Sequence, residues 1–170
     1  MTMSAGELSD SEGLWRFSLA FYARPGVSEA LIALQDRARC DVNLMLFALW
    51  LGVSGRSRLT KEELAIADRI ARPIGTDIVE PLRALRRKLS SAPDRDVQRL
   101  REGIKALELA AEKVIQDRLG RSPGPAFDDA EPAARAAVAC ANLALYLGPE
   151  MTRGAEAAAI AEAVEVFLRG

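Results

Sequence analysis

The sequence predicts an all-α protein, folded as a compact single-domain bundle of about seven or eight helices. Three observations lead to this prediction. Alanine and leucine dominate the chain, and only 5% of the residues are aromatic, which favours helix over strand. Apolar residues recur three and four positions apart, which is the period of an amphipathic helix. The 170 residues suffice for one core, so we expect a flexible segment 1–8 and one helical domain over 9–170.

The first two helices are marked by their ends. Ser9 and Glu12 have the spacing of a capping box and open the first helix, which Pro25 and Gly26 terminate. A second helix begins near Val27, where apolar residues again follow the helical period.

The third and fourth helices differ in character. Residues 42–51 are apolar on every side, which predicts the central and most buried helix, ended by Gly52 as a C′ glycine. Thr60 and Glu63 form a second capping box, and the helix that they open is expected to end near Pro73.

A further apolar stripe continues past Pro81, where we expect a kink or a helix start. The next helix runs from about Asp94 to Leu119. Its apolar residues alternate three and four apart and predict a packed seam of the coiled-coil kind. The seam consists of Val97, Leu100, Ile104, Leu107, Ala111 and Val114.

The last two helices are expected to start at Pro132 and at Thr152, with Gly148-Pro149 between them. In the first of the two, small residues repeat every four positions and favour a close approach by another backbone. These residues are Ala136, Cys140 and Ala144. The final helix presents Ile160, Val164, Phe167 and Leu168.

Composition excludes several kinds of chemistry. The chain has no histidine, which rules out histidine-based acid–base catalysis, Ser-His-Asp and Cys-His nucleophile systems, and His-ligated zinc. Cys40 and Cys140 have no CxxC partner and are interpreted as structural thiols. No phosphate-binding loop or metal-spacing motif occurs, so we expect no catalytic residue, no metal and no cofactor.

Three polar residues interrupt the apolar segment 14–52, namely Asp36, Asp41 and Asn43. The favoured interpretation makes Asp41 the N-cap of the buried helix and pairs Asp36 with Arg37 or Arg39 at the surface. The alternative is a polar pocket inside the bundle, which these three residues and Arg24 would line, with Mg²⁺ on the carboxylates.

Two other groups are candidates for contacting a partner. Arg83, Arg86 and Arg87 form a basic cluster, which we interpret as a solvated helix end that favours the helix dipole; nucleic-acid binding through 83–101 is the alternative. The aromatic first helix, with Trp15, is either covered by its neighbours or faces a second molecule.

The N-terminal segment is acidic and polar and lacks the features of a signal peptide. The longest apolar run, 44–53, is about half of the roughly twenty residues that a membrane-spanning helix needs. We therefore expect a cytoplasmic protein without a membrane span.

Several short motifs carry a resemblance to a known family. They are Trp15-Arg-Phe-Ser-Leu, Tyr22-Ala-Arg-Pro-Gly26-Val, Leu34-Gln-Asp36, Asp41-Val-Asn-Leu44 and Leu49-Trp-Leu-Gly52, with a weaker match at Pro81-Leu-Arg-Ala-Leu-Arg86. The chain resembles an uncharacterised bacterial family of conserved hypothetical proteins. The resemblance implies a bacterial, cytoplasmic and helical protein, and it implies no activity.

The leading hypothesis for function is a non-enzymatic helical interaction or assembly protein that binds a protein partner or itself. A small-ligand-binding protein or Mg²⁺-dependent enzyme, with its pocket near Asp36, Asp41 and Asn43, is the first alternative. Nucleic acid is the least favoured partner, because the net charge is −1 and no aromatic residues interleave the arginines.

Overall fold

The computed structural model describes residues 12–56, 58–121 and 131–170. These residues are almost entirely helical and contain no strand, which confirms the predicted all-α fold. The helices are α2 (Gly13–Tyr22), α3 (Val27–Ala38), α4 (Val42–Val53), α5 (Lys61–Ile74), the π-helical turn η1 (Gly75–Val79), α6 (Glu80–Lys88), α7 (Arg95–Gly120), α8 (Pro132–Thr152) and α9 (Ala155–Arg169). The predicted flexible segment 1–8 and the Ser9 cap lie outside the described residues.

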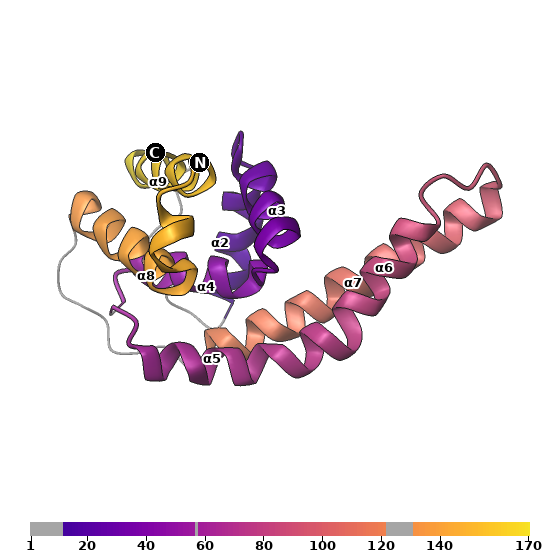
Figure 1. The fold of residues 1–170 in the computed structure, drawn as a ribbon, viewed down its shortest axis with the longest axis horizontal. Helices are drawn as coiled ribbons and strands as arrows, with labels where there is room; N and C mark the ends of the chain where they lie inside the picture. Colours follow the sequence, from indigo (N-terminus) through magenta and orange to yellow (C-terminus); the bar gives the residue numbers. More distant parts are fainter. Residues whose placement is uncertain (1–11, 57, 122–130) are drawn as a thin grey trace.

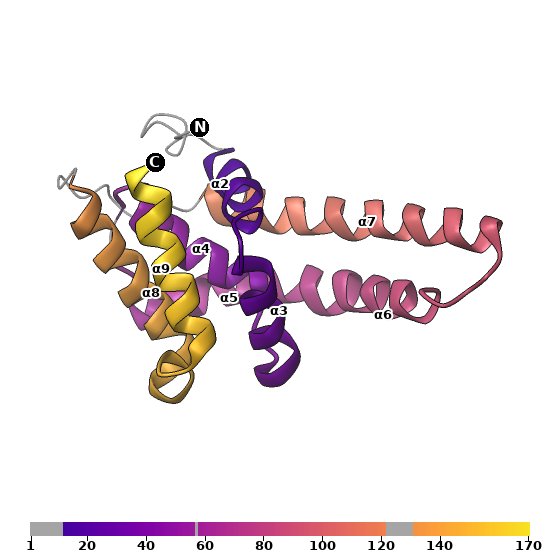
Figure 2. The same cartoon turned by 90° about the horizontal axis from the view of Figure 1, so that it is seen from above.

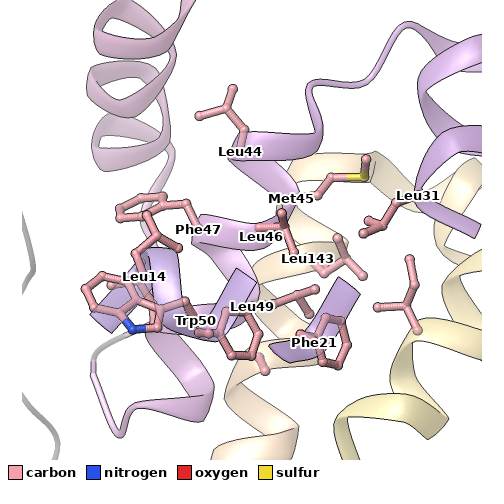
Figure 3. Packing of buried hydrophobic residues seen from close by; sticks show 14 of the residues in the cluster. Leu14, Phe21, Leu31, Leu44, Met45, Leu46, Phe47, Leu49, Trp50 and Leu143 are labelled. Carbon is pink, nitrogen blue, oxygen red and sulfur yellow. The ribbon is translucent and has the colours of Figure 1, made fainter. Parts of the chain in front are cut away.

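Helix α4 is the centre of the bundle formed by α2, α3, α4, α8 and α9. Every residue from Asn43 to Val53 is buried, as the all-round apolar pattern predicts. Figure 3 shows Leu46, Leu49 and Trp50 of α4 among side chains from neighbouring helices, including Leu14 and Phe21 of α2. A stripe on α9, with Ile160, Val164 and Phe167, also faces this core, as predicted.

The closest helix contact in the bundle joins α4 to α8. Gly52 lies inside α4, so the prediction that it ends the helix is wrong. A Cβ atom at Gly52 would lie 2.2 Å from the backbone nitrogen of Ala139. The predicted close approach to α8 therefore exists, but Ala139 makes it, and the half-buried Cys140 and Ala144 lie beside the buried face.

The middle of the chain forms a long helical hairpin. Helices α5, η1 and α6 follow one another without a break and pack against α7. Figure 1 shows α5 beneath the bundle, with α6 and α7 extending away from it, and Figure 2 shows α6 and α7 side by side. We call α6 with the first half of α7 (residues 95–108) the hairpin arm.

The expected helix end at Pro73 is wrong, because the helix continues through Pro73 into η1. Each proline lacks the backbone N–H that would donate within a helix. The chain accommodates Pro73 and Pro81 by widening to a π-turn between them. A kink or a helix start is expected at Pro81, and Pro81 lies in the first turn of α6.

The predicted seam on α7 is also wrong for half of its members. Leu100, Leu107 and Val114 are exposed, and Ile104 is the one fully buried member. The buried face of α7 is rotated toward Ile104, Glu108, Ile115 and Leu119. Arginines on α6 bind Glu108 and Glu112, and these ion pairs turn the polar face of α7 toward α6.

Helix caps are confirmed where a side chain carries them. Asp41 accepts a backbone N–H bond at the start of α4, and Thr60 and Glu63 form the predicted capping box. Asp94, which was not predicted as a cap, accepts two backbone N–H bonds at the start of α7. Thr152 does not cap α9, whose N-cap is Gly154; its hydroxyl donates to the carbonyl of Gly148 instead. Within the described residues, no helix is long and apolar enough to span a membrane.

Candidate functional site

Asp36, Asp41 and Asn43 line one cleft of about 780 Å³, at the place where the hairpin joins the bundle. Its walls come from the end of α3, the start of α4, helix α5, the turn η1 and helix α6, with Tyr146 contributed by α8. We call it the junction cleft. The sequence left two interpretations of these three residues open, caps and surface pairs or a pocket. The structure places all three in one cavity, and the predicted cap at Asp41 forms as well.

Asp41 has the most constrained position in the cleft. Its Oδ1 accepts the backbone N–H of Asn43 at 2.8 Å, and its own N–H donates to the hydroxyl oxygen of Tyr146 at 2.7 Å. Burial raises the pKa of the Asp41 carboxyl, although the N–H groups of Asn43 and Leu44 act in the opposite direction. Burial likewise raises the pKa of Tyr146, so its phenol stays protonated at neutral pH.

Asp36 forms an ion pair, but not with the predicted partners. It binds Arg87 of α6 at 3.1 Å, whereas Arg37 pairs with Glu156 of α9. Arg39 lies at the end of α3 with φ 54°, in the left-handed region that usually favours glycine. This backbone turn, which closes α3 just before Asp41, places Arg39 at the junction cleft.

The basic cluster is largely engaged by acidic residues that the sequence analysis did not select. Arg83 binds Glu108 and Glu112, each at 2.9 Å, and Arg86 also binds Glu108. Burial alone would raise the pKa of Glu108, but hydrogen bonds from Arg86 and Arg83 bring it below its ordinary value. Burial raises the pKa of Glu112. The sequence does contain a signal for this acidic cluster, because Glu108 and Glu112 are four residues apart and so lie on one helix face.

A second cavity, of about 420 Å³, lies beside the junction cleft between α2, α3, α4, α6 and α7. We call it the apolar pocket. It shares Gln35, Asn43, Arg83 and Arg87 with the cleft, so these side chains form the boundary between the two. Asn43 is buried at this boundary, and its Oδ1 accepts a hydrogen bond from Gln116 of α7 at 3.0 Å.

Two of the remaining candidates fall in different places. Trp15 lines the apolar pocket, and the ammonium of Lys113 lies 5.8 Å from its ring centre. The guanidinium of Arg24 lies 5.3 Å from the ring centre of Phe167, and Arg24 lines neither cavity. The predicted grouping of Arg24 with Asp36, Asp41 and Asn43 is therefore wrong, because Arg24 turns toward α9.

The carboxylates of the cleft are not grouped like metal ligands. Among the residues described by the structure, no three Asp, Glu or Cys side chains lie in positions that could hold a metal ion together. Cys40 lines the cleft, and burial raises the pKa of its thiol, which disfavours the reactive thiolate. The side chains of the cleft offer hydrogen bonding and charge.

Comparison with known families gives one match. The model of the family described as "Protein of unknown function (DUF2390)" matches residues 13–119, more than half of the chain. The chain belongs to this family. No curated protein and no solved structure matches it.

The DUF2390 segment contains almost all of both cavities. It runs from the start of α2 to the end of α7, and so includes every residue that lines the apolar pocket. It includes all lining residues of the junction cleft except Tyr146. Helices α8 and α9 lie beyond it and complete the bundle around α4.

Proposed function

We propose that this protein binds a small organic molecule with an acidic group in the junction cleft. The observation that carries the proposal is the convergence of charged and polar residues from distant segments. Asp36, Asp41 and Asn43 come from one end of the DUF2390 segment, and Arg83 and Arg87 come from about forty residues later. A concave site with a few fixed polar groups is the usual form of a small-molecule site.

Arg39, and not the net charge of the cleft, favours an acidic group on the ligand, because four carboxylic acids line the cleft beside its arginines. Four arginines line it, and Asp68 and Asp36 pair with two of them, Arg72 and Arg87. Among the described residues, Arg39 has no ion-pair partner, so its guanidinium is available to a carboxylate or phosphate. The left-handed backbone at Arg39, which ends α3, costs about 1–2 kcal/mol for a residue other than glycine.

The turn η1 forms the wall of the cleft beside Asp41. π-Turns are frequent at functional sites, because the widened backbone displaces one wall of a helix. A Cβ atom at Gly75, the first residue of η1, would lie 3.5 Å from the Oδ2 atom of Asp41. Glycine therefore leaves room next to this carboxyl group for part of a ligand.

A thermal-shift experiment tests the proposal with defined probes: acetate, succinate, inorganic phosphate, AMP and the amino acids. We expect one chemical class to raise the melting temperature in a saturable manner. Arg39→Gln should abolish that rise, and Asp41→Asn should change its size. Arg95→Gln and Asp77→Asn are matched controls, since both residues are exposed and line neither cavity. An equal rise in native protein and in both cleft variants would contradict the proposal.

A second candidate function is assembly through α7, in the cytoplasm of a bacterium. Exposed small and apolar residues on α7 follow a strict alternation of three and four positions, the spacing of a helix-pairing seam. They are Leu100, Gly103, Leu107, Ala110 and Val114. Leu100 is 59% exposed and Leu107 is 60% exposed, so the leucines that coiled-coil spacing would bury face solvent.

Light scattering after size-exclusion chromatography tests this second candidate. A dimer that becomes a monomer when Leu100 and Leu107 are both changed to Ser would support it, with the exposed Leu19→Ser as control. A native protein that stays monomeric up to millimolar concentration would exclude self-association as the function of this surface. Nucleic-acid binding through 83–101 has less support, because Arg83, Arg86 and Arg87 are occupied by Glu108, Glu112 and Asp36.

A further inference from the structure

Several large apolar side chains of the DUF2390 segment are exposed to solvent and meet in the apolar pocket. Leu19 and Tyr22 of α2, Ile32 of α3 and Leu109 of α7 are all at least one-third exposed, and all four line the pocket. Trp15 lines it as well. Large apolar side chains that meet in a concavity mark a binding site, whereas scattered ones do not.

The wall of the pocket contains two polar groups that have no partner among the described residues. Ser18 is 4% exposed and Gln116 is 3% exposed, and within residues 12–56, 58–121 and 131–170 neither the hydroxyl of Ser18 nor the Oε1 of Gln116 has a hydrogen-bond partner. An unpaired buried polar group costs about 1–3 kcal/mol. Because both residues line the pocket, a ligand N–H or O–H group can satisfy these oxygens after a side-chain rotation.

The charged rim of the pocket is basic. Four cationic side chains line it against two carboxylates. The carboxylates, Glu108 and Glu112, are already bound to Arg83 and Arg86. Lys105 is exposed on the rim and, within the described part of the chain, has no ion-pair partner. The rim therefore attracts an anion, while the interior accepts an apolar body.

We propose that the apolar pocket is a separate binding site for an amphipathic acid, a molecule with an aromatic or branched aliphatic body and one anionic group. The body packs against Trp15, Leu19 and Leu109, and the anionic group lies toward Lys105. This site differs from the junction cleft in ligand chemistry, because the cleft is lined mainly by polar and charged residues. The two proposals can fail independently.

Two fluorescent probes test the inference on the full chain. 8-Anilino-1-naphthalenesulfonate has an aromatic body, an N–H donor and a sulfonate. N-phenyl-1-naphthylamine has the same body and donor without the charge. We expect both to bind saturably with one molecule per chain and to compete with each other. The sulfonate should make the charged probe bind several-fold more tightly at low salt, and added salt should reduce this advantage.

Variants with matched controls locate the site. Ala23 is exposed and lines the pocket, so Ala23→Trp should fill its mouth and weaken both probes more than tenfold. Ala158→Trp, on the exposed face of α9, should change neither. Lys105→Gln should weaken the charged probe two- to fivefold and leave the neutral probe unchanged, while Lys88→Gln, outside both cavities, should affect neither.

Several results would overturn the inference. Non-saturable fluorescence, or binding that Ala23→Trp leaves intact, would show that the probes do not occupy this pocket. Equal affinity for the two probes at low salt would show that the pocket does not select a ligand with an acidic group. A cooperative thermal transition in every variant distinguishes these results from misfolding. Arg39→Gln and Asp41→Asn should leave probe binding unchanged, so failure of the cleft proposal would not affect this test.

Discussion

The bundle and the hairpin arm are stabilised by different interactions, although both are helical. In the bundle, α4 buries eleven consecutive residues and meets α8 through a glycine. In the arm, α6 has no buried residue, and its contact with α7 includes a cluster of ion pairs between Arg83, Arg86, Glu108 and Glu112. Apolar packing is insensitive to pH and salt, whereas paired charges respond to both. Both candidate cavities lie where the two kinds of structure meet.

The largest effect on stability should follow when one methyl group is added inside the bundle. Gly52→Ala would place a Cβ atom 2.2 Å from the backbone of Ala139, and neither backbone can move without separating α4 from α8. We expect a loss of about 3 kcal/mol or more in the free energy of unfolding, measured by urea denaturation.

The same substitution in the arm is the control. Nothing lies within 4 Å of a Cβ atom at Gly103, which is in the middle of α7. Gly103→Ala should stabilise the protein by about 0.5–1 kcal/mol through helix propensity. If the two substitutions destabilise the protein equally, the close contact between α4 and α8 is wrong.

The next largest effect concerns the charges of the arm. Glu108→Gln removes the carboxylate that binds Arg83 and Arg86 and leaves partly buried guanidinium groups. We expect a loss of about 2 kcal/mol, between the values for exposed and fully buried pairs. Hydrogen exchange should locate the loss in α6 and the first half of α7, while α4 keeps its protection. Glu102→Gln, at an exposed carboxylate, should have little effect.

Acid should open the arm before the bundle. The folded-state pKa of Glu108 lies below its ordinary value, so its ionised form stabilises the fold. This contribution is complete above the unfolded pKa of about 4.3 and disappears as the pH falls through the lower, folded value. Amide exchange in α6 should therefore accelerate below about pH 4 relative to α4, and Glu108→Gln should remove most of this dependence. Simultaneous acid unfolding of the arm and α4 would contradict the comparison.

A smaller effect tests the junction itself. Arg39→Gly should relieve the left-handed backbone at the end of α3 and stabilise the protein by about 1 kcal/mol. The same change removes the guanidinium that we assign to ligand binding. Higher stability together with weaker binding of the probe found in the thermal-shift screen would support a functional reason for arginine at this position. Lower stability would mean that Arg39 has a structural role.

The sequence predicted the bundle better than the arm. The apolar pattern of α4 and the caps at Asp41 and Thr60 are local signals, and each of them formed as expected. The arm depends on which residues of α6 and α7 lie opposite each other. Arg86 of α6 lies opposite Glu108 of α7 and binds it. The length of the link between the two helices does not reveal which of their residues face each other.

The site was predicted in part for the same reason. Asp36, Asp41 and Asn43 are close in sequence, and they line one cleft. Their partners Arg87, Tyr146 and Gln116 come from three other helices, and no local signal connects them. Period analysis also chose the wrong face of α7, because it counts apolar residues and Glu108 is buried as a paired charge.

A crystallographic fragment screen tests most directly whether the junction cleft is a binding site. Crystals of the full chain would be soaked with small carboxylates and phosphates, and with neutral amides of the same shapes as controls. We predict that acidic fragments occupy the cleft and contact the guanidinium of Arg39, while the matched amides do not. Acidic fragments that bind elsewhere on the protein and leave the cleft empty would contradict the account.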